Sequence, residues 1–152
     1  MKTIISKDEP ITARELKIIM RKLDENIETT KLLNHHTEYK SGFLVSKASK
    51  LIPVDICKVA FFYIKNELVM VYTEKNETYM TDYSLDKLEE EVNPHDFYRA
   101  NRQFLINRRI VKEVEKYFAR KLLVKCHVAA PEPIIISKAK ATDFTKWLGG
   151  KH

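Results

Sequence analysis

Residues 97–109 read FYRANRQFLINRR and combine an apolar strand with basic, amide and aromatic side chains. The apolar run Phe104–Ile106 predicts a buried strand. Arginines can neutralise phosphates or bind guanine, and amides can match an adenine edge. The residues concerned are Arg99, Arg102, Arg108, Arg109, Asn101, Gln103 and Asn107. Two interpretations are therefore open, a nucleic-acid contact or a polar loop that enters a buried strand with ordinary solvated arginines.

Upstream of this stretch, β-branched and aromatic residues gather in five short runs, which predict strands. The runs lie at 43–45, 51–56, 59–64, 68–73 and 78–82. Pro53 lies inside the second run and cannot donate to a ladder, so this run is expected to be an edge strand or a loop. The connections at 65–67 and 74–77 are short, which predicts consecutive antiparallel hairpins rather than parallel crossovers.

Downstream, residues 110–118 and 121–128 alternate apolar and polar side chains and are joined by Ala119-Arg120, which predicts another hairpin. Pro131 and Pro133 then mark a loop or an edge before the run 134–136. Two helices are expected at the margins. Ser84 caps the first, 85–92, and Ser137 or Thr142 begins the second, which Phe144, Trp147 and Leu148 anchor and Gly149-Gly150 ends. The predicted fold class is mainly β, built from antiparallel strands and hairpins.

The N-terminal segment predicts a helix. Thr12 is a suitable N-cap, Glu15 completes a capping box, and Ile11 with Leu16 forms a hydrophobic staple. The apolar stripe of this helix either packs on the chain's own domain or forms a short dimer seam, since the repeat is too brief to establish a coiled coil. Residues 31–42 are polar and end in Gly42, which predicts a linker. We therefore expect an N-terminal helix and linker at 1–42 and a domain at 43–150.

The charge is concentrated near the C-terminus. Residues 97–152 contain 13 Lys and Arg against 4 Asp and Glu, whereas residues 45–96 contain 6 against 10. This asymmetry favours an anionic partner, either a nucleic acid or a membrane surface. The sequence shows no strongly basic amphipathic helix, which favours the nucleic acid. It also shows no signal-peptide pattern and no apolar run of about 20 residues, so a cytoplasmic location is expected.

Enzymatic functions find little support in the sequence. The three glycines, Gly42, Gly149 and Gly150, form no phosphate-binding loop or dinucleotide fingerprint. Cys126 and His127 are adjacent, but neighbouring strand residues point to opposite faces, so a buried free thiol is the favoured interpretation. No Cys and His residues have zinc-site spacing, and no cofactor is expected. The other cysteine, Cys57, is also expected to be a free thiol on or near a strand.

Several ordered blocks of the chain resemble the LytTR-type DNA-binding domain of bacterial transcription regulators. That family has an aromatic-rich strand, a His/Asn-Arg-Ser/Gln-aromatic-aliphatic-aliphatic-Asn motif, and an aliphatic-Ser-Arg/Lys motif before a terminal helix. The corresponding blocks here are DFYRANRQFLINRRIVKEVEKYF (96–118) and IIISKAKATDFTKWL (134–148), and the likeness includes KLIPVDICKVAFFYIKNELVMVYT (50–73) and YMTDYSLDKLEEEV (79–92). The family often has His at the position of Asn101.

The resemblance implies a LytTR-like β fold that binds double-stranded DNA sequence-specifically through loops between strands. The implied contacts are Asn66, Asn101, Arg102, Gln103, Lys138 and Lys140, with Arg108 and Arg109 meeting phosphates and Asn107 tying down its own turn. The piece at 6–23 also resembles the end of a receiver domain, so expected partners include a receiver domain or sensor kinase system and a second copy in a homodimer. The alternative is a protein-interaction or scaffolding module whose basic face binds an acidic partner.

Overall fold

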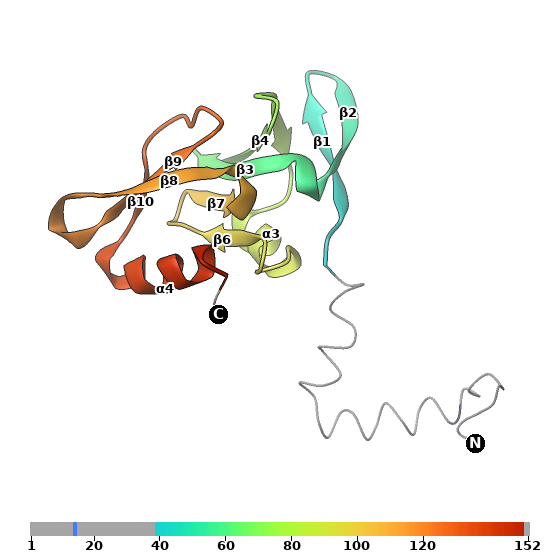
Figure 1. Cartoon of the computed structure of the whole chain (residues 1–152). Helices are drawn as coiled ribbons and strands as arrows, with labels where there is room; N and C mark the ends of the chain where they lie inside the picture. The colour runs from blue at the N-terminus through green and yellow to red at the C-terminus, as the bar shows by residue number, and fades with distance from the viewer. Residues whose placement is uncertain (1–13, 15–38, 151–152) are drawn as a thin grey trace. The chain divides into compact units, whose positions relative to one another are not determined.

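The computed structural model describes residues 14 and 39–150. The predicted N-terminal helix, its two interpretations and most of the predicted linker lie outside the described residues. Within 39–150 the elements follow one another along the chain (Figure 1). The strands are β1 (Gly42–Lys47), β2 (Lys50–Asp55), β3 (Val59–Lys65), β4 (Leu68–Thr73), β5 (Thr78–Thr81), β6 (Phe97–Arg99), β7 (Phe104–Asn107), β8 (Val111–Lys116), β9 (Leu122–Cys126) and β10 (Ile134–Ile136); the helices are α3 (Leu85–Glu91) and α4 (Lys138–Leu148), with 3-10 turns η1 (Ile56–Lys58), η2 (Arg108–Ile110) and η3 (Phe118–Arg120).

The strands described in 39–150 form two antiparallel sheets, one of seven strands in the order β2-β1-β5-β4-β3-β7-β6 and one of three in the order β10-β9-β8. This confirms the mainly β fold class and the predicted hairpins. Pro53 lies on β2 at the edge of the large sheet, opposite Leu44, and β10 follows its two prolines at the edge of the small sheet. These positions agree with the sequence prediction that the prolines mark edges or loops, because an edge strand can lack a backbone donor on its outer side.

Four turns of the described chain hold non-glycine residues in the left-handed region, at Ala48, at Asn66 and Glu67, at Asn76, and at Ala119 and Arg120. In the β3–β4 turn, Asn66 and Glu67 have φ angles of 53° and 64° between the paired residues Lys65 and Leu68. A two-residue connection with positive φ at both positions matches the right-handed twist of the flanking strands. The turn therefore fixes the register of the hairpin and holds Asn66 at its exposed tip.

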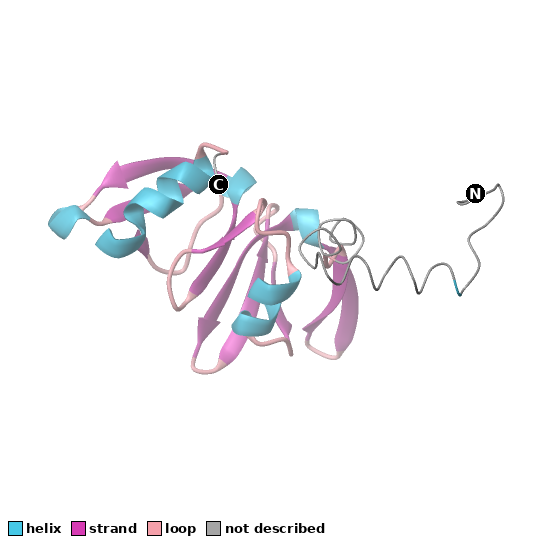
Figure 2. Ribbon diagram, turned by 90° about the horizontal axis from the view of Figure 1, so that it is seen from below, coloured by secondary structure: helices cyan, strands magenta, loops and turns pink. Residues whose placement is uncertain are grey.

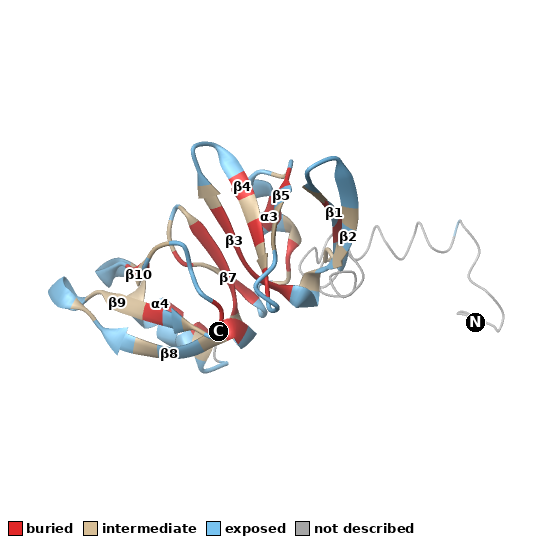
Figure 3. Ribbon diagram, turned by 90° about the horizontal axis from the view of Figure 1, so that it is seen from above, coloured by how far each residue is buried: buried red, intermediate tan, exposed pale blue. Residues whose placement is uncertain are grey.

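Strands β3 and β7 separate two hydrophobic cores, and Figure 3 shows buried residues along both strands. Phe61, Tyr63, Phe104 and Ile106 pack into a first core together with residues of α4 and the small sheet. The neighbouring residues Val59, Phe62 and Leu105 point the other way, into a second core with residues of α3 and β1. Burial on both faces explains why these strands read as continuous apolar runs instead of alternating ones.

The two described α-helices pack into different cores, α4 into the first and α3 into the second, and they lie apart in the view from below (Figure 2). In α3 the N-cap Ser84 accepts a hydrogen bond from the backbone N–H of Lys87, as predicted. In α4 the side chains of Phe144 and Trp147 are buried, and the indole Nε1 donates to the carbonyl of Pro94 at 2.8 Å. The last turn of α4 is thus fastened to the turn before β6.

One boundary differs from the sequence-based expectation. Gly42, expected as the last linker residue, is the first residue of β1. The backbone before it is also engaged, because Lys40 N–H donates to the Glu91 carbonyl and Ile56 N–H donates to the Ser41 carbonyl, each at 2.8 Å. These bonds were invisible in the sequence because the partners lie far along the chain.

Candidate nucleic-acid interface

The loop between β6 and β7, residues 100–103, is shaped by the side chain of Asn101. Its Oδ1 accepts hydrogen bonds from the backbone N–H of Gln103 at 2.8 Å and of Phe104 at 3.1 Å. Its Nδ2 donates to the carbonyl of Ile135 in β10 at 3.0 Å. Asn101 therefore closes its own loop and ties that loop to the small sheet.

Two further bonds bring neighbouring segments to the same place. The backbone N–H of Ile64 donates to the Gln103 carbonyl at 3.0 Å, just before the β3–β4 turn that carries Asn66. The Lys140 ammonium donates to the Arg99 carbonyl at 3.0 Å, which joins the first turn of α4 to β6. Three segments that are distant in sequence therefore meet at one end of the domain.

We call this end the loop face and define it by the predicted contact residues that it brings together. These are Asn66, Asn101, Arg102, Gln103, Lys138 and Lys140. Asn66, Arg102 and Lys138 are exposed, and among the residues that the structure describes their side chains make no hydrogen bond or ion pair. Their side chains are free to meet a ligand, whereas Asn101 and Lys140 are already engaged within the domain.

A carboxylate that the sequence did not single out stands beside the loop face. Glu132 Oε2 accepts hydrogen bonds from the hydroxyl of Tyr63 and from Gln103 Nε2, the latter at 3.4 Å. Burial, followed by the bond to Glu132, raises the pKa of Tyr63 to about 12. Glu132 lies in a loop between two prolines and no sequence pattern marks it; its position next to Gln103 depends on the packing of β10 against the large sheet.

Arg99, which the sequence offered as a phosphate contact, is committed inside the domain. Its Nη1 is 2.9 Å from Asp86 Oδ1 and 2.8 Å from Glu89 Oε1, and only 17% of the side chain is exposed. The same guanidinium donates to the carbonyls of Asn101 and Arg102. This corrects the expectation for Arg99, which supports the loop instead of meeting phosphates.

Arg108 and Arg109 lie at the opposite end of β7 from residues 100–103. The guanidinium of Arg108 donates to the carbonyls of Trp147 and Leu148 at 2.9 Å each, at the C-terminal end of α4. Arg109 is exposed on η2, and within 39–150 its side chain has no partner. The structure does not bring these two residues to the loop face, where the other predicted contact residues lie.

Asn107 has the structural role that the sequence predicted for it. The side chain is buried, its Oδ1 accepts from the backbone N–H of Arg109 at 2.9 Å, and its Nδ2 donates to the Val59 carbonyl at 2.8 Å. It therefore caps η2 and joins β7 to the start of β3.

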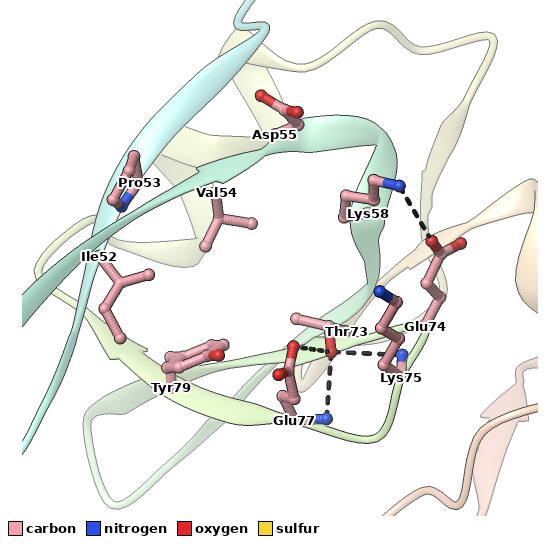
Figure 4. A pocket seen from close by; sticks show the side chains of 10 residues that line it. All are labelled: Ile52, Pro53, Val54, Asp55, Lys58, Thr73, Glu74, Lys75, Glu77 and Tyr79. Atoms are coloured by element: carbon pink, nitrogen blue, oxygen red, sulfur yellow. Dashed lines mark hydrogen bonds and ion pairs between the residues drawn. The ribbon is translucent and has the colours of Figure 1, made fainter.

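A separate cavity lies between β2 and the β4–β5 turn, away from the loop face (Figure 4). It has a volume of about 270 Å³ and is lined by Ile52, Val54 and Tyr79 among others. Three of its charged side chains are engaged locally: Lys58 pairs with Glu74 at 3.6 Å, and Glu77 accepts a hydrogen bond from the Thr73 hydroxyl. The residues that line it thus supply no evident reactive group.

The cysteines and the potential metal ligands of the described residues also form no evident reactive site. Both Cys57 and Cys126 are free thiols, as predicted, and burial raises the pKa of Cys126 to about 11. A raised pKa leaves little thiolate at neutral pH, so Cys126 is a poor nucleophile. No cluster of three or more potential metal ligands occurs among residues 14 and 39–150, and no helix in this part of the chain is long and apolar enough to cross a membrane.

Residues 49–149 match the model of the LytTr DNA-binding domain family, and the chain belongs to this family. The antiparallel fold described above agrees with that assignment, and the domain is therefore a DNA-binding domain of the kind used in transcription regulation.

Two relatives illustrate the likeness. The sensory transduction protein LytT of Oceanobacillus iheyensis is 25% identical over 146 residues, which cover 95% of this chain and 57% of LytT. This chain thus spans a little over half the length of that relative. The solved LytTr DNA-binding domain of a putative methyl-accepting/DNA response regulator from Bacillus cereus superimposes with a TM-score of 0.64 and 26% identity, covering 72% of this chain and 98% of that domain.

Proposed function

We propose that the domain binds double-stranded DNA sequence-specifically through the loop face and acts as a transcription regulator. One observation carries the proposal: Asn66, Arg102 and Lys138 come from three distant segments, lie at one end of the domain, and leave their polar groups exposed and unpaired in the described part of the chain. Loops that carry an amide, a guanidinium and an ammonium can combine base reading with phosphate contacts.

The proposed roles differ among the residues of the loop face. Arg102 reaches a base edge, Asn66 contacts a base or the backbone beside it, and Lys138 meets a phosphate. Asn101 and Lys140 hold the loops in place through the bonds described above. Gln103 contacts the DNA with the part of its amide group that does not bond to Glu132. We leave Arg108 and Arg109 out of the interface because they lie at the far end of β7.

The partners beyond DNA follow from the relatives. LytT is called a sensory transduction protein and the Bacillus cereus protein a response regulator, so a receiver domain is a fitting source of the signal for this domain. A homodimer is proposed as well, since two linked copies would bind two half-sites with a gain in effective concentration. No catalytic role is proposed for this domain.

Selection of bound duplexes from a random pool tests sequence specificity directly. The expected result is one enriched motif, followed by a preference for that motif over random duplex that persists at moderate salt. Folded protein that enriches no motif, or that binds selected and random duplexes equally, would contradict the proposal. That result would favour the scaffolding alternative. A binding assay with acidic proteins would then test that alternative.

A further inference from the structure

We propose that the tip of the β8–β9 hairpin, residues 117–121, is a second DNA-contacting element, which grips the sugar–phosphate backbone flanking the sequence read by the loop face. The tip has the sequence Tyr-Phe-Ala-Arg-Lys. This inference rests on the proposed function, because it needs a duplex seated on the loop face. It adds a contact that neither the family motif nor the loop-face residues include.

Strand register places the tip beside the loop face. Leu122, the residue after the tip, pairs with Lys116 on one side and with Ile136 on the other. Ile136 directly precedes Ser137 and Lys138, so α4 begins next to the tip, and α4 contacts η3. Figure 1 shows the hairpin extending beyond the start of α4 at this side of the domain.

The distance between the two elements suits one continuous duplex. Asn101 of the loop face bonds to the carbonyl of Ile135, which pairs with Leu123. Lys121, the last residue of the tip, comes two residues before Leu123, which is about 7 Å along the strand. A duplex seated on the loop face would therefore have its flank next to the tip.

The side chains of the tip suit a nucleic-acid backbone. Phe118 is 65% exposed, and Arg120 is exposed beside it. The Lys121 Nζ lies 4.8 Å from the centroid of the Phe118 ring, and the Tyr117 ring lies 4.6 Å from that ring. The tip contains no acidic residue. Two cations can thus neutralise phosphates, while the exposed ring offers an apolar surface to a deoxyribose.

The backbone holds this arrangement in place. Tyr117 N–H donates to the Lys121 carbonyl at 2.8 Å, and Lys121 N–H donates to the Phe118 carbonyl at 3.2 Å. Ala119 and Arg120 have φ angles of 58° and 63°, in a region that residues other than glycine adopt infrequently. A closed turn with these angles presents Phe118 outward without loss of packing elsewhere, because the ring contributes to neither core.

The test uses the double variant Phe118→Ser with Arg120→Ala in the full chain, and Lys125→Ala as a control on the same hairpin. Each protein is titrated on two duplexes, the selected motif alone and the motif extended on both sides by about one helical turn, about 10 base pairs. Wild type is expected to bind the extended duplex more tightly. The double variant should lose that gain and flatten the salt slope by about one unit, and should match wild type on the short duplex.

Each outcome has a separate meaning. If the double variant keeps the wild-type gain on the extended duplex while motif binding is intact, the tip proposal is overturned and the proposed function stands. If wild type itself shows no motif preference, the proposed function fails and the tip proposal fails with it. A change in self-association, with DNA affinity unchanged on both duplexes, would overturn the tip proposal in favour of a protein contact. The exposure of both residues makes a folding defect unexpected, and thermal unfolding of the variants checks this.

Discussion

At the scale of single residues, the two asparagines in residues 97–109 have structural roles. Asn101 and Asn107 each accept from backbone N–H groups through Oδ1 and donate through Nδ2 to the carbonyl of another strand. In sequence, an amide that reads a base and an amide that shapes a loop look the same. The hydrogen bonds of the structure distinguish the two roles. The side chain of Asn101 is engaged within the domain, whereas the side chain of its neighbour Arg102 is not.

Asn101→Ala is expected to reduce the free energy of unfolding by about 1–3 kcal/mol, because two backbone donors and the Ile135 carbonyl lose their partner. Urea unfolding measures the change, with Gln103→Ala as the control, since the weak bond of the Gln103 amide to Glu132 should cost much less. An Asn101→Ala protein that is as stable as wild type but has lost base preference would mean that Asn101 reads DNA directly.

Arg102→Ala is expected to narrow the difference in binding free energy between motif and random duplex by about 1–3 kcal/mol, the worth of a bidentate base contact. Arg109→Ala is the matched control, since Arg109 is also an exposed arginine but lies at the other end of β7. It should leave both affinities nearly unchanged. Salt titrations on both duplexes measure these effects. A uniform loss for Arg102→Ala would assign that residue to phosphates, and a lower salt slope for Arg109→Ala would restore the phosphate contact that the family resemblance implied.

At the scale of elements, local patterns predicted the strands and hairpins well, because turn chemistry and apolar runs are local properties. The Ser84 cap and the hairpin around Ala119 and Arg120 were predicted correctly for this reason. The order of strands was not predictable, since β1 reaches its neighbour β5 through the single pair Ser46 and Met80. Nor could composition reveal that Arg99 pairs with Asp86 and Glu89 rather than facing solvent.

The anchoring of α4 gives a prediction at this scale. Arg108→Ala is expected to reduce the free energy of unfolding by about 1.5–3 kcal/mol, because its charged guanidinium bonds to the last carbonyls of the helix. DNA affinity and its salt dependence should stay near wild type when the protein is folded. Arg108→Lys should restore only part of the stability, since an ammonium lacks the planar fork. Urea unfolding and a salt titration together check this, and a lower salt slope with unchanged stability would show a phosphate contact instead.

At the scale of the whole molecule, β3 and β7 contribute side chains to both cores, and each adjoins a loop of the proposed interface: β3 ends at the turn that carries Asn66, and β7 begins after residues 100–103. The second core and the β1–β2 hairpin lie toward the acidic middle of the chain, whereas the loop face and the β8–β9 tip draw on its basic last third. The exposed cations of the loop face and of the tip thus come from separate segments, while Arg108 and Arg109 lie at the other end of β7. A single rigid pair of strands is expected to transmit any packing defect to the loops.

The domain boundary provides the last prediction. A protein of residues 40–150 is expected to unfold cooperatively with a midpoint near that of the full chain, since it keeps the bonds of Lys40 to Glu91 and of Ser41 to Ile56. A protein that begins at residue 43 loses both and should be less stable by about 1–3 kcal/mol.

If residues 1–39 carry a dimer seam, the 40–150 protein should be a monomer that binds one half-site as the full chain does but loses the gain in affinity on a duplex with two half-sites. Sedimentation and binding to one-site and two-site duplexes measure this, and an equal association state with an equal gain would leave the N-terminal stripe to pack within its own chain.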